Sequence, residues 1–207
     1  MRWIAGILAA LGAFALVLQF RLVLGVNAVA GIGIGETVVR FFSYFTILSN
    51  TMAALALLGI ALGHRNTFFS HAGVQTAIAA YITVVCIVYF FILSALWTPT
   101  GPQWLADVLL HYAMPVLYVL FWLAFVPKDS LRWRDVPYWL IFPLLYVIVV
   151  LARGSFANFW PYPFLETGRL GWGAVLLNCA AMLAFFTVVA LAYTAIARLL
   201  AKRAKNI

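Results

Sequence analysis

The sequence predicts an all-α integral membrane protein that crosses the bilayer six times. Hydrophobic residues make up 67% of the 207 residues and charged residues only 9%, whereas a soluble domain has about 45–50% and about 25% of these. A spanning helix takes about 20 apolar residues, so six of them fill most of this chain. We therefore expect one six-helix transmembrane domain over residues 1–207, which excludes a soluble enzyme and a disordered chain.

Six apolar runs mark the expected spans. Lipid cannot satisfy open backbone groups, and the runs lack the alternation of barrel strands, so each is expected to be a helix. The first run is longer than the roughly 7–15 residues of a signal-peptide core, so it is expected to be retained. The spans are Trp3–Val26, Val38–Leu62, Val74–Leu96, Trp104–Phe125, Tyr138–Ala152 and Trp172–Ala197.

Lys and Arg gather on one side of these spans, and such a bias marks the cytoplasmic side. Both termini are therefore expected in the cytoplasm. The net charge of +8 reflects this flanking, and nucleic acid is not expected as a partner because no basic stripe lies outside the spans. The cytoplasmic group is Arg2, Arg65, Lys128, Arg132, Arg134, Arg198, Lys202, Arg203 and Lys205; the opposite group is Arg40, Arg153 and Arg169, with Arg21 near the outer end of the first span.

Polar residues inside two spans predict a site in the outer half of the protein, because such residues are costly in lipid. Ser43, Thr46 and Asn50 would share one face of the second helix, and Asp107 and His111 one face of the fourth. At 1.5 Å per residue, Thr46 and His111 would each lie roughly 12 Å deep. The charges expected around this outer cavity include Arg21, Arg40 and Glu166.

Each of these residues also has a structural interpretation. Thr46 can bond its own backbone, His111 can be a packing residue, and Asp107 can be a solvated residue of the first helical turn. Asn50 can bond across helices, and Arg21 and Arg40 can reach the headgroups. In the functional interpretation, Asp107 orients His111, which activates the Thr46 hydroxyl as a nucleophile.

The sequence predicts neither a metal site nor a cofactor. Cys86 and Cys179 fall inside apolar runs and are expected to be packing residues rather than a disulfide or zinc ligands. His64 and His71 are seven residues apart with no acidic ligand nearby.

Three segments together resemble the androgen-induced-protein family and its bacterial six-span relatives. They are Tyr44-Phe45-Thr46-Ile47-Leu48-Ser49-Asn50, Leu110-His111-Tyr112-Ala113-Met114-Pro115 and Trp160-Pro161-Tyr162-Pro163-Phe164-Leu165-Glu166. The resemblance implies an intramembrane threonine hydrolase, whose eukaryotic members cleave fatty acid esters of hydroxy fatty acids. It also implies a bacterial plasma membrane protein with a fatty-acyl ester as substrate.

Thr46 matches the family's threonine directly, whereas only the first of the family's two histidines has a counterpart in this sequence. The family has two histidines three residues apart, with the catalytic role on the second; here the first is His111 and the second position is Met114. The expected enzyme therefore uses Thr46 as nucleophile and His111 as base, with oxyanion donors from Asn50 or a backbone amide. The alternative is a non-catalytic protein that binds or transports a lipid or small molecule.

The segment from Arg153 to Gly171 is expected to be a long external loop. Its aromatic residues and prolines suit either a stiff lid over the cavity or a belt that anchors the sixth helix at the interface. In a lid, Glu166 would pair with Arg21, Arg40 or Arg153.

Overall fold

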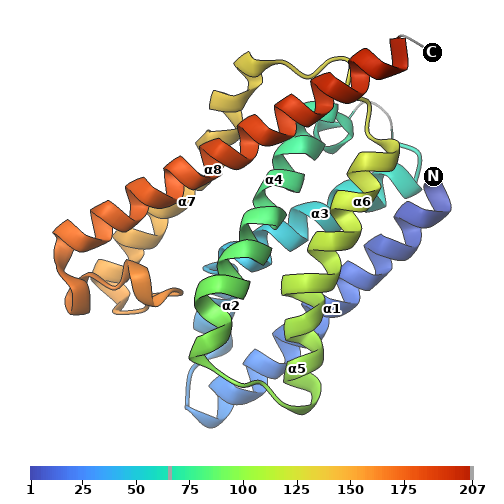
Figure 1. Ribbon diagram of the computed structural model, residues 1–207. Coiled ribbons are helices and arrows are strands. Elements are labelled where there is room, and N and C mark those ends of the chain that lie inside the picture. The colour runs from blue at the N-terminus through green and yellow to red at the C-terminus, as the bar shows by residue number, and fades with distance from the viewer. Residues whose placement is uncertain (65–66, 206–207) are drawn as a thin grey trace. The chain divides into compact units, whose positions relative to one another are not determined.

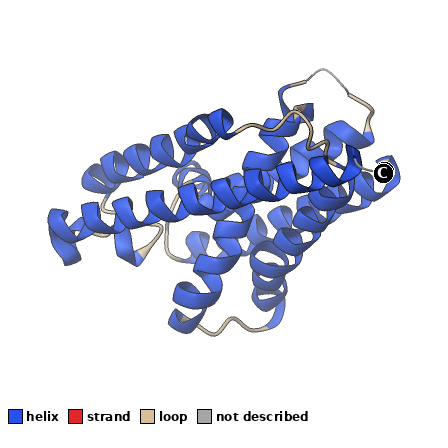
Figure 2. Ribbon diagram, turned by 45° about the horizontal axis from the view of Figure 1, so that its top comes forward, coloured by secondary structure: helices blue, strands red, loops and turns tan. Residues whose placement is uncertain are grey.

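A computed structural model describes residues 1–64 and 67–205, and these are helical with no strand among them (Figures 1 and 2). The sequence predicts one domain, and the helices gather into two compact units, Met1–Ser130 and Leu131–Ile207. The expected basic residue Arg65 lies outside the described residues.

The first unit is a ring of four helical columns. α1 (Arg2–Val29) contacts α3 (Phe45–Ala61), α3 contacts α4 (Ala72–Val88), and α4 contacts α6 (Met114–Phe125). The ring closes because α1 also contacts α6 and the preceding α5 (Gly101–Val108). Every column therefore packs against two neighbours. The third span and the segment Leu109–Ala113 of the fourth span both contact α3.

The expected second span is not one helix. It is divided into α2 (Ile34–Phe42) and α3, whose axes differ by 79° across Ser43 and Tyr44. Only one of the two helices can therefore run along the membrane normal. α3 has 17 residues, which at 1.5 Å per residue is about 25 Å, near the lower limit for a span.

The third and fourth spans each contain a π-helical segment. Tyr89–Leu93 follows α4, and Leu109–Ala113 joins α5 to α6. A π-helical turn inserts one extra residue into a helix and is frequent at functional sites. Both helices therefore depart from regular geometry within the part of the unit that holds His111.

The core of the first unit combines large side chains with small ones. Trp122 is fully buried and its Nε1 donates to the Thr76 hydroxyl at 2.9 Å. Met114 is fully buried too, and packs against Gly12 of α1, where a Cβ would come 2.9 Å from the Met114 Cε atom. The glycine thus makes room for the methionine between α1 and α6.

A lysine closes the C-terminal end of α6. Lys128 Nζ donates to the carbonyls of Trp122, Leu123 and Val126 and lies 4.7 Å above the Trp122 ring. The Leu123 carbonyl lies in the last turn of α6, where a helix leaves carbonyls without intrahelical donors, while the Trp122 carbonyl also accepts from the Val126 N–H. Partial burial lowers the pKa of the Lys128 ammonium.

The second unit is a pair of antiparallel helices, α7 (Val136–Ala157) and α8 (Thr167–Lys205). Arg198, near the end of α8, lies 6.0 Å above the ring of Trp133, just before α7. α7 is longer than the expected span and includes Arg153, so the expected external loop is shorter than predicted. Within α8, Gly171 has φ 77°, so regular helix continues only from Trp172.

Among the residues that the structure describes, five helical stretches are long and apolar enough to cross a membrane, or six if α2 and α3 count as one span. By length and composition the chain is a multi-pass membrane protein. The expected placement of both termini in the cytoplasm remains a prediction.

Candidate functional site

Thr46 lies at the second position of α3, immediately after the bend. It is buried, with 6% of its surface exposed, and Asn50 one turn later is fully buried. Asn50 Nδ2 donates to the carbonyl of Thr46 at 2.9 Å and to the carbonyl of Leu110 at 3.1 Å. One nitrogen thus bridges the two carbonyls, which fixes the Thr46 turn beside the residue that precedes His111.

Asp107 and His111 contact each other as their spacing predicts. His111 Nδ1 lies 3.1 Å from the Asp107 Oδ1 atom and 3.1 Å from the Asp107 backbone oxygen. Asp107 is buried, so the interpretation of a solvated first-turn carboxylate is wrong. A backbone carbonyl can only accept, so the contact of Nδ1 with the Asp107 backbone oxygen is a hydrogen bond in the tautomer that carries its proton on Nδ1, and that tautomer has Nε2 as its acceptor.

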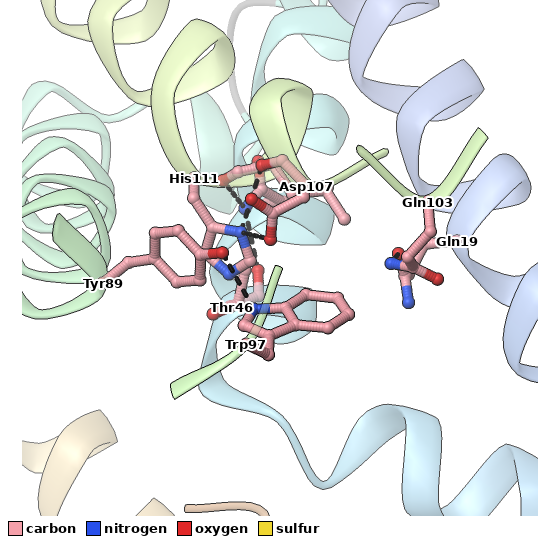
Figure 3. Close-up of polar contacts among 9 residues, drawn as sticks. Gln19, Thr46, Tyr89, Trp97, Gln103, Asp107 and His111 are labelled. Carbon is pink, nitrogen blue, oxygen red and sulfur yellow. Dashed lines mark hydrogen bonds and ion pairs between the residues drawn. The ribbon is translucent and has the colours of Figure 1, made fainter. Parts of the chain in front are cut away.

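Sequence reasoning missed two aromatic residues of this cluster. The ring of Tyr89 stacks on the His111 imidazole at a centroid distance of 3.7 Å and an interplanar angle of 13°. The Tyr89 hydroxyl in turn accepts a hydrogen bond from Trp97 Nε1 at 3.0 Å. Tyr89 is one of several aromatic residues in an apolar run, and nothing in its spacing distinguishes it. Figure 3 shows Thr46, Tyr89, Trp97, Asp107 and His111 gathered in one cluster, with the Gln19–Gln103 pair apart from it.

Two buried oxygens of the site accept no hydrogen bond from the residues that the structure describes. They are Asn50 Oδ1 and Asp107 Oδ1. The Asp107 atom is close to the imidazole, but the Nδ1–H is directed at the backbone carbonyl. A buried acceptor without a donor is costly, so each of the two atoms would be stabilised by a hydroxyl or N–H group placed beside it.

The structure places three expected site residues, Ser43, Arg40 and Arg21, differently from what their spacing predicts. Ser43 ends α2 and donates to the Val39 carbonyl at 2.7 Å, so it does not share the face of Thr46 and Asn50, because the helix breaks between them. The same break invalidates the depth counted for Thr46 along a continuous helix. Arg40 pairs with Glu36 of the same helix at 2.8 Å, and Arg21 is exposed on α1.

The amide of Asn50 does not serve as an oxyanion donor here. A primary amide has two N–H groups, and Asn50 directs its nitrogen at two carbonyls. Donors for an oxyanion would therefore come from backbone amides.

Glu166 and the aromatic segment belong to the second unit. Glu166 pairs with Arg169 of its own unit at 3.2 Å, because the short turn before Gly171 brings residues 166 and 169 together. The expected pairing with Arg21 or Arg40, which belong to the first unit, stays a prediction. Arg169 also donates to the Pro163 carbonyl, and Asn178 to the Phe164 carbonyl at 2.9 Å. The segment is thus fastened to the start of α8.

Comparison of the chain with models of protein families, with curated proteins and with solved structures found no match. Its chemistry therefore has to be inferred from the site itself. Across residues 1–64 and 67–205, no three His, Cys, Asp or Glu side chains gather as metal ligands. What the cluster offers is a hydroxyl, an imidazole and a carboxylate from adjoining helices, which suits acid–base and nucleophilic chemistry.

Proposed function

We propose that this protein is an intramembrane hydrolase of a lipid ester, with Thr46 as nucleophile and His111 as general base. The observation that carries the proposal is the buried Asp107 carboxylate 3.1 Å from His111 Nδ1. The hydrogen bond from Nδ1–H to the Asp107 backbone carbonyl would fix the tautomer, and the carboxylate beside it would stabilise the imidazolium that forms during catalysis. Asp107 is then a positioning residue at the Nδ1 edge of the ring, and Tyr89 stacks on one of its faces.

The reaction would take place in two stages. Thr46 Oγ1 attacks the ester carbonyl carbon while His111 Nε2 takes its proton, and the leaving alkoxide then receives that proton as its C–O bond breaks. Water repeats the sequence on the acyl-threonine and releases the carboxylic acid. Because Thr46 lies in the first turn of α3, the positive end of the helix dipole favours the negative charge of the tetrahedral intermediate.

The packing of Met114 supports His111, rather than position 114, as the site of the general base. Met114 meets α1 at Gly12, and the Ala54 side chain of α3 adjoins the same point. Ala54 is eight residues after Thr46, or about 12 Å along the helix. A histidine at 114 would therefore enter the packed seam between helices, far from Thr46, and we expect Met114→His to add no activity.

The test is covalent labelling of the purified protein by a fluorophosphonate ester probe. We expect labelling in the wild type, its loss in Thr46→Ala, and its retention in Thr46→Ser. The matched control is Thr51→Ala, which removes a threonine from the same helix whose hydroxyl donates to the Ile47 carbonyl. Loss of a general base lowers a rate about 10²–10⁴-fold, so His111→Ala should slow labelling to that extent.

A non-catalytic lipid-binding or transport protein is the second candidate. The buried acceptors Asn50 Oδ1 and Asp107 Oδ1 favour it, since they can hold a ligand hydroxyl without any reaction. Folded wild-type protein that is not labelled, or labelling that is equal in Thr46→Ala and Thr51→Ala, would refute the hydrolase and leave this candidate.

A further inference from the structure

The end of the third span directs the indole of Trp97 toward an earlier residue of the same span. After α4, Tyr89–Leu93 is π-helical, Ser94–Leu96 is a 3-10 helix, and Trp97 has extended backbone. Residues eight apart in a regular helix are about 12 Å apart along its axis, yet Trp97 Nε1 donates to the Tyr89 hydroxyl at 3.0 Å. Figure 3 shows the two side chains directed at each other.

The Tyr89 ring is confined on several sides. It is buried, with 4% of its surface exposed, and lies edge-on to Tyr112 at a centroid distance of 5.6 Å. One of its faces lies parallel to the His111 imidazole at a centroid distance of 3.7 Å. Burial and the edge contact restrain the ring sideways, and the hydrogen bond from Trp97 fixes the position of its hydroxyl end.

This stack restricts the orientation of the imidazole. Rotation about the Cβ–Cγ bond of His111 would tilt the imidazole out of its near-parallel contact with Tyr89, in which the planes differ by 13°. A half-turn about this bond keeps the rings parallel, but it exchanges Nδ1 with a C–H group. The Asp107 backbone oxygen, 3.1 Å from Nδ1, favours the orientation in which an N–H faces it. Tyr89 and Asp107 together therefore specify the plane of the imidazole and the position of its Nε2.

We propose that Trp97 is a positioning residue for His111 and acts through the Tyr89 ring. By holding Tyr89 parallel to the imidazole, the Trp97 N–H keeps the proton of the neutral imidazole on Nδ1 and the lone pair of Nε2 in a fixed direction. In the hydrolase that lone pair takes the Thr46 proton, so the effect on rate rests on the proposed function. The tautomer belongs to the folded chain whether or not Thr46 reacts.

The test is ¹⁵N NMR of the histidine-labelled full chain in nanodiscs, at alkaline pH, where the imidazole is neutral. The chain has three histidines, so His64→Gln with His71→Gln leaves His111 as the labelled imidazole. The chemical shifts of its two nitrogens show which one carries the proton, and we expect Nδ1. A neutral hydrogen bond changes an equilibrium about two- to tenfold. Trp97→Phe should therefore lower the ratio of the Nδ1–H to the Nε2–H tautomer by that factor.

Trp104→Phe is the matched control, because it removes the same N–H group from an exposed tryptophan of α5. Tyr89→Phe keeps the stacked ring and removes the hydroxyl, so it should shift the ratio as Trp97→Phe does, and it replaces that variant if Trp97→Phe fails to fold. The two changes together should add nothing to either one, because both remove a single hydrogen bond. A proton on Nε2 without these changes, or a ratio in either folded variant equal to that of the control, would overturn the proposal.

Labelling by the fluorophosphonate probe separates this proposal from the proposed function. A tautomer shift in Trp97→Phe, with no labelling of any folded protein, would support positioning by Trp97 and refute the hydrolase. Labelling that is lost in Thr46→Ala, with tautomer and rate both unchanged in Trp97→Phe, would support the hydrolase and overturn positioning by Trp97. If both proposals hold, Trp97→Phe should be labelled about two- to tenfold more slowly than Trp104→Phe.

Discussion

Gly154 and Trp160 provide a quantitative test of how the aromatic segment of the second unit folds. Gly154 is buried in α7, and a Cβ added there would lie no more than 2.5 Å from three carbons of the Trp160 ring. Carbon atoms in contact are normally about 3.5–4.0 Å apart. In Gly154→Ala the indole must therefore leave its place on α7.

The expected cost follows from two opposing effects. Overpacking costs about 1–3 kcal/mol, whereas alanine is about 0.8–1 kcal/mol better than glycine in a helix. Gly173→Ala isolates the second effect, because a Cβ at Gly173 meets nothing within 4 Å. Gly154→Ala should therefore be about 1–3 kcal/mol less stable than Gly173→Ala.

Thermal unfolding in detergent measures this difference through a thiol-reactive dye that reports exposure of Cys86 and Cys179. About 2–4 °C in Tm is expected for each kcal/mol in a chain of this size. In the background Trp160→Ala, the Gly154→Ala change should lose its penalty, since the ring is gone. Equal Tm values for Gly154→Ala and Gly173→Ala would refute the contact of the Trp160 ring with Gly154. The aromatic segment would then not be packed against α7 at this point.

Two other predictions concern charge and topology. Glu166→Gln should change the Tm little, because its pair with Arg169 is largely exposed and such pairs contribute about 0–1 kcal/mol; a loss of several degrees would show a buried partner instead. In a background without Cys86 and Cys179, a cysteine at Arg132 should be shielded from an impermeant thiol reagent in intact cells, and one at Ala157 should react; the reverse pattern would place the termini outside.

Composition was sufficient to predict the class of fold, because apolar runs of spanning length leave few alternatives to helices. The contact of Asp107 with His111 also followed from their spacing. The break at Ser43 and Tyr44 did not, since neither residue is a proline or a glycine. Helix breaks set by tertiary packing leave no local signal in such a run.

The stacking of Tyr89 on His111 depends on the placement of two helices and could not be predicted from either segment. The pairing of Glu166 with Arg169 was not predicted, because the candidate partners were distant arginines. The short turn before Gly171 brings Arg169, three residues further on, within 3.2 Å of Glu166.

The π-helical segment Leu109–Ala113 has a consequence for comparing this chain with other sequences. Residues before and after such a segment are rotated relative to one another by about one residue's share of a turn, or roughly 100°. In any second sequence, the residue three positions beyond the one aligned with His111 occupies the place of Met114 only if that protein carries the same inserted residue. An alignment with a sequence that lacks the bulge needs a one-residue gap in this segment. Without that gap, a substitution chosen from the aligned position would fall on the wrong face of the helix.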